Sequence, residues 1–513
     1  MVNSIRIKNL RSLKDTDNIS IKKLNILVGS NSSGKSTFLR VFPLLKQSFN
    51  KKINGPILWC GDDDDYVDFG SFQEALRYNS ENKSISLAFE MDMNYENRYG
   101  RKEYRRTRDK TRGKTRGKTY IEFLIKSRTD NINDYISELR CDVNDQKFVA
   151  YFEEDGNISK VKLNEEKMEI NKERESFFFP FYERGIFDIS LYQIRENAIY
   201  NLMSLFSIEQ DEIQNTRMLD EGTDYIVNEK ILKMKSFTEY NTKIIDKVEK
   251  IYMAGEKKKI KEIERWSYMY NLPNYFFNLS RNLNSYFSNV YYIAPVRATA
   301  ERYYRLRNAA VNEVDCRGKN LPVFLNSLSK QDFEQFQDWT NEHLGFTVEK
   351  KTSEGHVSLK IKKKGQKKAV NLSDTGFGYS QILPIVTQIW YIAKKARSHS
   401  RFFVQDSSLP IIIIIEQPEL HLHPALQAKL IDIIVKVASE QNVNFIIETH
   451  SETMINRVGS SIENEKIKNS DVGVLIFEKK FGEDDTLVKR GGFDEEGYLE
   501  NWPIGFFDPE MEL

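Results

Sequence analysis

The chain lacks the features that mark a secreted or membrane-spanning protein. Its 513 residues include three cysteines, Cys60, Cys141 and Cys316, which lie far apart and show no metal-ligand spacing. No apolar run approaches the roughly 18 residues that a membrane-spanning helix needs. The first residues, "MVNSIRIKNL", have no signal-peptide pattern. These absences predict a reduced, cytoplasmic protein with no membrane segment.

The chain also lacks a surplus of charge of either sign. Its net charge is +1, so binding to a polyanion would need a local basic segment. One such segment lies at 98–118, where "TRGK" occurs twice and Tyr99 and Tyr104 stand among lysines and arginines. It predicts either a nucleic-acid contact, through phosphates and stacked bases, or a solvated loop outside any core.

The length and the hydrophobic patterns predict an α/β fold with more than one part. Residues 1–186 contain strand-like segments and are expected to form an N-terminal lobe with an antiparallel β subdomain. Within 187–290, apolar residues recur every three to four positions among lysines and glutamates, which predicts a helical insertion. Strand and helix patterns then alternate through 291–513, the expected C-terminal lobe.

A phosphate-binding motif is present near the N-terminus. Residues 29–36 read "GSNSSGKS", between the strand-like "LNILV" and the helix-like "STFLRVF". In this context the backbone N–H groups and the helix N-terminus bind phosphate oxygens, Lys35 adds a positive charge, and Ser36 offers its hydroxyl to Mg²⁺. The motif therefore predicts a site for ATP and Mg²⁺ formed by Asn31, Ser32, Ser33, Gly34, Lys35, Ser36 and Thr37.

A run of five isoleucines ends in the acidic segment "EQPE". The run at 411–415 predicts a strand buried on both faces, whose end lies at the nucleotide crevice. Glu416 is expected to hold Mg²⁺ there, directly or through water. Gln417 follows, and an amide can orient a water molecule but cannot accept its proton. Either Glu419 substitutes as the base, or turnover is slow, or ATP mainly clamps a dimer; we favour slow turnover.

Two further segments are expected to contact the nucleotide. "ETH" follows the apolar "VNFII", which places His450 at the same sheet edge as the isoleucine strand. A neutral imidazole there can bind a γ-phosphate or a water molecule, although a histidine that merely ends a strand is the alternative. Residues 371–384 place small residues before a helix and predict a second anion-binding nest, suited to a partner's nucleotide, that includes Gly376, Gly378 and Ser380.

Taken together, "GSNSSGKS", "DTGFGYSQ", "EQPELHLHP", "IIETHS" and "YYIAPVRATAERYYR" resemble the motifs of ABC-type ATPase heads. The chain is more similar to AAA-like proteins related to the overcoming-lysogenization-defect (OLD) ATPases, and in particular to ATPase subunits of anti-phage systems of the Septu and retron-associated type. The resemblance implies an ATPase head that pairs head-to-tail as a homodimer or higher even oligomer. "DTGFGYSQ" of one subunit would then close over ATP of the other, with 420–424 as the dimer-contacting loop.

The resemblance also implies a role for Gln73, in "DFGSFQEAL", as a residue that reaches Mg²⁺. A glutamine exposed on the surface before a helix is the alternative. OLD proteins continue into a Toprim nuclease domain, whereas 63 residues follow His450 here. Nuclease activity within this chain is therefore not expected.

Two functions follow from the resemblance. The first is an ATP-gated sensor or scaffold of a bacterial anti-phage complex, which hydrolyses ATP slowly and controls a separate effector, a nuclease or a toxin. The second is an ATPase of the DNA-repair or structural-maintenance type that acts on DNA. The sequence has no long heptad coil and no zinc hook, which favours the first function.

Overall fold

A computed structural model of the chain describes residues 2–51, 53, 55–62, 65–95, 115–130, 133–143, 146–168, 198, 201, 250–251, 253–306, 313–402, 409–479 and 484–502. Two compact units are present. Unit 1 combines the two ends of the chain, Met1–Asp134 and Ser285–Leu513, and unit 2 is Tyr135–Asn284. The domain boundary expected at 186/187 falls outside the described residues, so the domain limits given above stay predictions.

A parallel sheet forms the centre of unit 1. β18 (Val472–Lys479), β4 (Leu24–Gly29), β17 (Val443–Glu448), β16 (Ile411–Glu416) and β11 (Val290–Ile293) lie side by side in that order. The three middle strands are buried along almost their whole length, as continuous Ile, Leu and Val runs predict for a sheet covered on both faces. Their carboxyl ends share one edge, so the loops after β4, β16 and β17 meet there.

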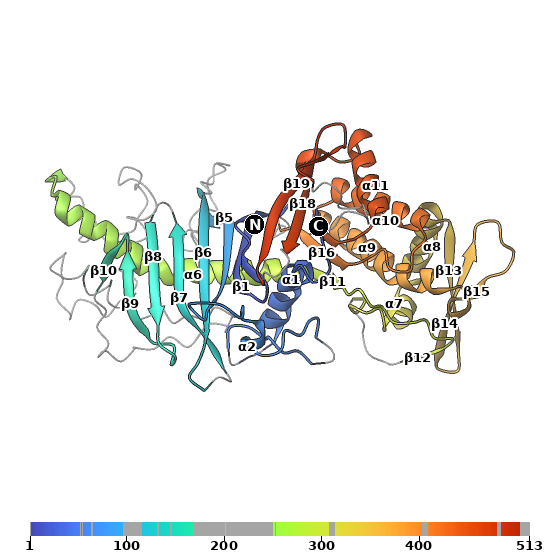
Figure 1. The fold of residues 1–513 in the computed structure, drawn as a ribbon, viewed down its shortest axis with the longest axis horizontal. Helices are drawn as coiled ribbons and strands as arrows, with labels where there is room; N and C mark the ends of the chain where they lie inside the picture. Colours follow the sequence, from blue (N-terminus) through green and yellow to red (C-terminus); the bar gives the residue numbers. More distant parts are fainter. Residues whose placement is uncertain are drawn as a thin grey trace, which may run out of the picture. The chain divides into compact units, whose positions relative to one another are not determined.

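Helices cover both faces of this sheet (Figure 1). One face packs into a core with α9 (Phe377–Phe402), α10 (Pro424–Glu440) and α11 (Glu452–Glu463). The other face packs against α1 (Lys35–Asn50), which contacts β4, β11 and β17. Since α1 follows β4 directly, its first turn lies at the carboxyl edge of the sheet.

Strand register decides which side chains reach α1. On β16 and β17, Ile413, Ile415, Phe445 and Ile447 belong to the core under α9 to α11. Side chains alternate along a strand, so the strand-terminal residues Glu416 and Glu448 point to the opposite face, toward α1. The two glutamates are register partners on neighbouring strands. The fold therefore delivers two carboxylates, side by side, beneath the first turns of α1.

The rest of unit 1 is largely antiparallel. One group comprises β1 (Val2–Leu10), β2 (Leu13–Asp15), β3 (Ile19–Ser20), β5 (Ile85–Tyr95), β6 (Thr115–Ser127), β19 (Thr486–Phe493) and β20 (Leu499–Glu500). A second, small sheet contains β12 (Tyr304–Arg305), β14 (His356–Lys363), β13 (Phe346–Ser353) and β15 (Val370–Asn371). Unit 1 also contains the helices α2 (Phe72–Ala75), α7 (Leu321–Ser327) and α8 (Lys330–Leu344), and the 3₁₀ turns η4 (Leu372–Asp374) and η5 (Asn469–Asp471).

Unit 2 joins an antiparallel sheet to most of one long helix. Its strands are β7 (Asp134–Val143), β8 (Gln146–Phe152), β9 (Ile158–Leu163) and β10 (Glu166–Met168). α6 (Lys257–Ser288) packs on them, with the rings of Phe148 and Phe276 5.9 Å apart. Gly255 adopts φ +66° in a turn just before α6.

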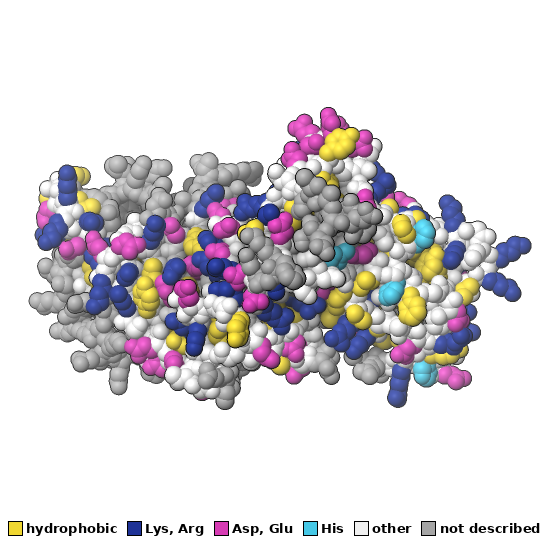
Figure 2. Space-filling model, in the orientation of Figure 1, with side chains coloured by type: hydrophobic (Ala, Val, Ile, Leu, Met, Phe, Trp, Pro, Cys, Tyr) yellow, Lys and Arg dark blue, Asp and Glu magenta, His cyan; other side chains and the backbone are white. Residues whose placement is uncertain are grey.

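The predicted α/β fold class is confirmed: a mixed sheet with flanking helices, an antiparallel β part and a long helix in the expected insertion. The basic segment 98–118 lies outside the described residues up to 114, and its last residues begin β6. None of the described helices combines the length and apolarity needed to span a bilayer. Acidic and basic side chains mingle over the visible face (Figure 2), in keeping with a net charge of +1.

Candidate nucleotide site

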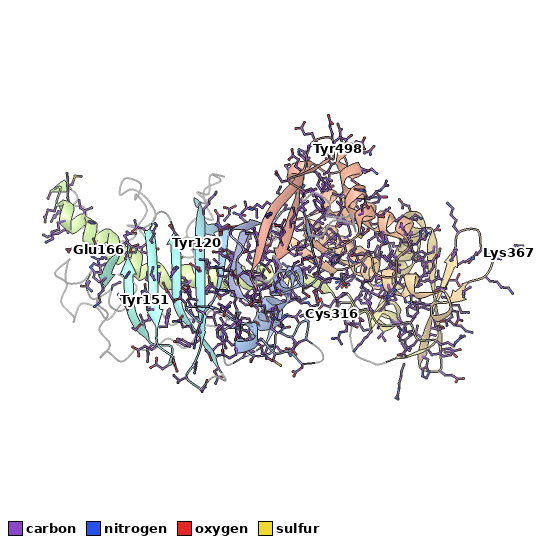
Figure 3. All side chains as sticks on the ribbon, viewed as in Figure 1. Tyr120, Tyr151, Glu166, Cys316, Lys367 and Tyr498 are labelled. Atoms are coloured by element: carbon purple, nitrogen blue, oxygen red, sulfur yellow. The ribbon has the colours of Figure 1, made fainter. Side chains whose placement is uncertain are left out.

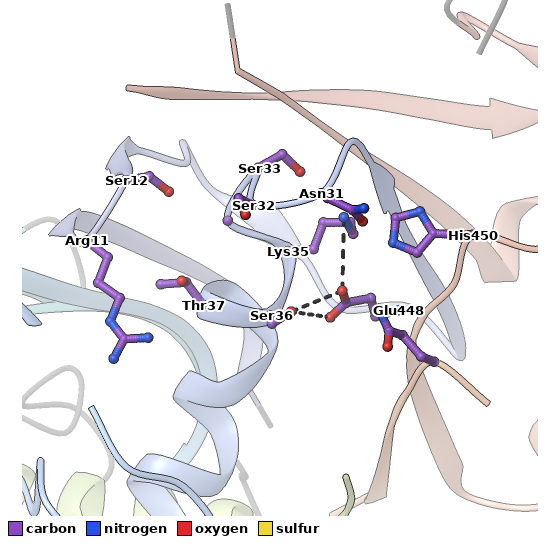
Figure 4. Close-up of a pocket in the computed structure, with 12 residues that line it drawn as sticks. Arg11, Ser12, Asn31, Ser32, Ser33, Lys35, Ser36, Thr37, Glu448 and His450 are labelled. Atoms are coloured by element: carbon purple, nitrogen blue, oxygen red, sulfur yellow. Dashed lines mark hydrogen bonds and ion pairs between the residues drawn. The ribbon is translucent and has the colours of Figure 1, made fainter. Parts of the chain in front are cut away.

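The motif at 29–36 forms the wall of a cavity at the carboxyl edge of the parallel sheet. The cavity measures about 350 Å³. It is lined by Arg11, Ser12, Asn31, Ser32, Ser33, Gly34, Lys35, Ser36, Thr37, Gln417, Glu448 and His450 (Figure 4). All seven cradle residues that the sequence predicted are among them, together with the predicted Gln417 and His450.

Two glycines allow the cradle to close. Gly29 has φ +151°, and a Cβ there would lie 2.2 Å from the carbonyl oxygen of Phe477. Gly34 has φ +90°, and a Cβ there would lie 2.8 Å from the Ser12 hydroxyl. Both positions combine a backbone conformation that favours glycine with a close approach of another strand. No other residue fits either position without moving its neighbours.

The N-terminus of α1 opens into the cavity. Its N-cap residue, Gly34, supplies no side-chain cap, so the first N–H groups of the helix stay free for an anion. Lys35 is buried, and its Nζ donates to the carbonyl oxygens of Gly29 (3.0 Å) and Ser30 (2.7 Å). Burial lowers the pKa of Lys35. The site therefore concentrates hydrogen-bond donors and one buried lysine, which suits phosphate oxygens.

The carboxylate against Ser36 comes from β17. Ser36 Oγ donates to the carboxylate of Glu448, at 3.0 Å from Oε1 and 2.8 Å from Oε2. Lys35 Nζ lies 4.0 Å from Glu448 Oε1. Burial raises the pKa of Glu448 to about 7, and the nearby negative charge of Glu416 contributes. Glu448 was not among the residues expected from the sequence.

Glu416, expected to hold Mg²⁺, is engaged elsewhere in this structure. It ends β16 as predicted and is 1% exposed, yet it does not line the cavity. Arg40 of α1 binds both of its oxygens at 2.7 Å, and Tyr292 of β11 donates to Oε1 at 2.8 Å. The reason is the helical repeat: Arg40 lies one turn beyond Ser36 on α1, directly over the next strand.

Gln417 is held by its backbone in an unusual conformation. Its φ is +43°, which is rare for a residue other than glycine. Its N–H donates to the carbonyl oxygen of Glu448 (2.9 Å), and Arg297 donates to the carbonyl oxygen of Glu416 (2.9 Å). The surrounding bonds therefore fix a backbone turn that places Gln417 in the cavity wall. Such conformations concentrate at functional sites.

Glu419 supports the segment that carries His450. Its carboxylate accepts hydrogen bonds from Thr449 Oγ1 (2.9 Å) and from the backbone N–H of His450 (2.7 Å). It does not line the cavity.

Burial, with help from the positive charge of Lys35, lowers the pKa of His450. The imidazole facing the cavity is therefore neutral near pH 7.

The cavity contains polar atoms that fit a bound nucleotide. Ser33 Oγ and His450 Nε2 are buried and have no hydrogen-bond partner among the described residues. No described group of three or more His, Cys, Asp or Glu side chains is placed to hold a metal ion. Mg²⁺ commonly binds through one or two protein oxygens together with phosphate oxygens and water. Ser36 and a neighbouring carboxylate therefore fit that ion when phosphates are present.

The remaining predicted residues lie away from the cavity. Gln73 is exposed on α2 and does not line it. Gly376, Gly378 and Ser380 lie at the start of α9, where Gly376 has φ +84° and open space around its missing Cβ. The exposed ring of Phe377 lies 5.8 Å from the ring of His421. The expected second nest thus adjoins the 420–424 loop, on a surface separate from the cavity.

Arg11 and Ser12, in the turn between β1 and β2, also line the cavity but were missed from the sequence. Arg11 packs over Phe69, with its Cζ 4.5 Å from the ring centroid, and burial lowers its pKa. Nothing in the local sequence distinguishes this turn. Glu448 did leave a signal, because it is the first charged residue after a buried apolar strand, as Glu416 is.

Comparison with known proteins identifies the family. A family model described as an AAA ATPase domain matches residues 1–455, so the chain belongs to this family. No curated protein matches the chain.

Solved structures with a similar fold are heads of Smc proteins. An Smc head bound to the C-winged helix domain of ScpA is 12% identical, covers 96% of this chain and 98% of its own, and has a TM-score of 0.34. An Smc head from Pyrococcus furiosus is also 12% identical, covers 95% and 96%, and has a TM-score of 0.32. The head domain from Thermotoga maritima is 10% identical, covers 95% and 98%, and has a TM-score of 0.33.

Proposed function

We propose that this member of the AAA ATPase domain family is a slow ATPase. It would bind ATP with Mg²⁺, pair head-to-tail with a second copy, and use the pairing to control a separate effector protein. The observation that carries the proposal is the cavity itself. A glycine-bounded cradle, a helix N-terminus and a buried lysine line one side, while Gln417, Glu448 and His450 line the other. This arrangement suits a triphosphate and its attacking water.

Each residue has a definable role in this mechanism. The N–H groups at the start of α1 and the ammonium of Lys35 bind the β- and γ-phosphates. When bound, Mg²⁺ neutralises charge on those phosphates. His450 presents Nε2 to the γ-phosphate or to the attacking water. Gln417 orients that water by hydrogen bonds without taking its proton.

The amide at 417 is the reason to expect slow turnover. General-base assistance is worth about 10²- to 10⁴-fold in rate. Glu419, the alternative base, already accepts two hydrogen bonds outside the cavity. Since neither residue is placed to accept the water proton, the chain is expected to remain in the ATP-bound state for long periods.

Head-to-tail pairing is supported by the surface at the start of α9. There Phe377 is 61% exposed, and Gly376 leaves open space beside it. A phosphate bound in the cradle of one copy would be closed by this segment of the other. The resemblance of these motifs to ATPase subunits of anti-phage systems supports a role as the sensor or scaffold of such a complex, with a nuclease or a toxin as the effector.

Sedimentation of the purified chain with Mg²⁺ and a non-hydrolysable ATP analogue tests the pairing. We expect a monomer without nucleotide and a dimer with it, whereas Lys35→Ala and Phe377→Glu stay monomeric. Tyr498→Glu is the matched control, because Tyr498 is 68% exposed and lies at the turn between β19 and β20 (Figure 3). A wild-type chain that sediments the same with and without nucleotide, or a Phe377→Glu variant that pairs normally, would contradict this proposal.

The effector role needs a test in cells. Expressed with its neighbouring genes in a phage-sensitive bacterium, the wild-type chain is expected to lower plaque numbers, and Lys35→Ala to abolish the protection. Equal plaque numbers with and without the genes would count against the anti-phage role and would leave the ATPase proposal standing.

A further inference from the structure

We infer that Glu448, at the end of β17, is the carboxylate that holds Mg²⁺ together with Ser36, and that Glu416 instead anchors α1 to the sheet. This inference rests on the proposed binding of ATP and Mg²⁺. It reverses the roles expected from the sequence, in which the end of the isoleucine strand supplied the metal carboxylate.

The first argument is the spacing of Ser36 and Arg40 on α1. Residues four apart on a helix lie one above the other on the same face. Beneath them, Glu448 and Glu416 are register partners on adjacent strands. Each helix residue therefore meets one carboxylate: Ser36 with Glu448 at 2.8 Å, and Arg40 with Glu416 at 2.7 Å through two parallel hydrogen bonds. Only the first pair lines the cavity.

The second argument is the balance of charge. The carboxylate of Glu416 is satisfied by the guanidinium of Arg40 and the hydroxyl of Tyr292. The carboxylate of Glu448 is 2% exposed and receives hydrogen bonds, among the described residues, from the Ser36 hydroxyl alone. Lys35 lies 4.0 Å away and donates to two carbonyl oxygens instead. A buried carboxylate with so little compensation is stabilised by a cation.

The third argument is the position of Glu448 relative to the phosphates. β17 lies directly between β4, which leads into the cradle, and β16. The residue that ends β17 is thus nearer to the cradle than the residue that ends β16. Mg²⁺ bound by Ser36 and phosphate oxygens would supply a closer positive partner than Lys35, which lies 4.0 Å from the Glu448 carboxylate.

A competing arrangement has Glu416 leave Arg40 and turn toward Ser36 when ATP binds. That rotation would break two charge-assisted hydrogen bonds and leave Arg40 without its partner. It would also bring a second carboxylate next to Glu448, which like charges oppose. The two arrangements make opposite predictions for single substitutions.

The test measures Mn²⁺, in place of Mg²⁺, by electron paramagnetic resonance on the full chain loaded with a non-hydrolysable ATP analogue. Glu448→Gln keeps the size of the side chain and removes its charge. We expect it to weaken Mn²⁺ binding by about 10-fold or more. Glu416→Gln and the control Glu440→Gln, at an exposed position of α10, are expected to stay within about 3-fold of wild type. Binding of a fluorescent ATP analogue in EDTA, without metal, is expected to survive in Glu448→Gln.

Retention of wild-type Mn²⁺ affinity by Glu448→Gln would overturn the inference, whatever happens to Glu416→Gln.

A double variant provides a second readout. The losses of Mn²⁺ affinity in Ser36→Ala and Glu448→Gln should be less than additive when the two are combined, because both residues bind one ion. Full additivity would also contradict the inference. Failure of the proposed function gives a different result, since wild-type chain would then bind the ATP analogue no better than Lys35→Ala.

Discussion

Gln417 and His450 both line the cavity, and each has a feature that suits the proposed binding of a triphosphate. Gln417 holds a left-handed backbone conformation, with φ +43°, against the carbonyl oxygen of Glu448. His450 keeps a buried Nε2 with no partner among the described residues. In the proposed function, both features would serve the γ-phosphate or the attacking water.

Substitution of His450 tests its role as a γ-phosphate contact. His450→Ala is expected to lower single-turnover ATP hydrolysis by about 10²-fold, because a neutral imidazole that positions phosphate or water is lost. Binding of the nucleotide is expected to change little, since the cradle and Lys35 remain. His356→Ala, at an exposed position of β14, serves as the control. Unchanged hydrolysis in His450→Ala would show that the histidine only ends its strand.

Asp134 provides a pH-dependent contribution to stability, remote from the cavity. The carboxyl group is 6% exposed and accepts a hydrogen bond from Trp59 Nε1 at 2.8 Å. Burial raises its pKa from 3.8 to about 6. A raised carboxyl pKa means that the native state holds the proton more tightly than the unfolded state. The contribution is therefore full below pH 4 and is lost as the pH rises through 6.

Asp134→Asn is expected to remove that pH dependence. The amide oxygen still accepts from Trp59, and no charge is buried at high pH. Relative to the wild type, the variant should gain stability between pH 4 and pH 7, on the order of 3 kcal/mol at most. Urea unfolding of both chains at pH 4, 5, 6 and 7 measures the difference. A difference that does not change with pH would contradict the raised pKa.

The residue scale is also where the sequence was least informative. The cradle could be predicted because its glycines and lysine follow a local pattern. The exchange of roles between Glu416 and Glu448 could not, because it depends on Arg40, one turn along α1 from Ser36. Each strand end, taken alone, offers one plausible metal carboxylate. The register between β16 and β17 shows that two carboxylates lie side by side. The contact with Arg40 shows that the carboxylate of Glu416 is already paired.

At the scale of elements, α1 is fastened to the sheet by a largely buried ion pair. Glu416 is 2% exposed in its side chain and Arg40 is 31% exposed. Removing one member of such a pair leaves a buried charge, which is more harmful than removing both. Tyr292 alone cannot compensate for that charge, because its hydroxyl is neutral. Burial raises the pKa of this tyrosine, and the negative charge of Glu416 adds to the effect.

Arg40→Met is therefore expected to lower the free energy of unfolding by about 3 kcal/mol. This value is at the lower end of the loss expected when a buried ion pair is broken, because Arg40 is partly exposed. The double variant Arg40→Met with Glu416→Met should recover most of that loss. Urea unfolding at constant pH measures both. If the double variant is no more stable than the single one, Glu416 is not the group that Arg40 compensates.

Most elements could be predicted because their hydrophobic patterns are strong. The strand expected at 411–415 is β16, Ile411–Glu416. The helix expected to follow the small residues of 371–384 is α9, Phe377–Phe402. The limits of the compact units were not predictable in the same way. Unit 2 begins at Tyr135 and ends at Asn284 because of contacts between residues far apart in sequence. Local sequence patterns do not reveal such contacts.

At the scale of the whole molecule, the proposed head-to-tail pairing would make each site composite. One copy would supply the cradle and the other would supply the start of α9. Two variants that are each inactive should therefore complement one another when mixed. A pair formed by Lys35→Ala and Phe377→Glu contains one site with an intact cradle and an intact α9 segment, and one site with neither.

Equal amounts of the two variants are expected to recover up to about half of wild-type ATP turnover, because neither variant pairs with itself and each mixed pair has one working site. The variants measured alone are the controls. A mixture as inactive as its components would mean that both segments act within one copy, and the sites would then not be composite.

The central claim is that the amide of Gln417 makes ATP hydrolysis slow, so that the chain stays bound to ATP for long periods. The most direct test compares ATP turnover by wild type and Gln417→Glu, with Lys35→Ala as the blank. The account predicts wild-type turnover only slightly above the blank and a rise of about 10-fold or more in Gln417→Glu, because a carboxylate can accept the water proton. Brisk turnover by wild type, unchanged in Gln417→Glu, would contradict it and would mean that another group activates the water.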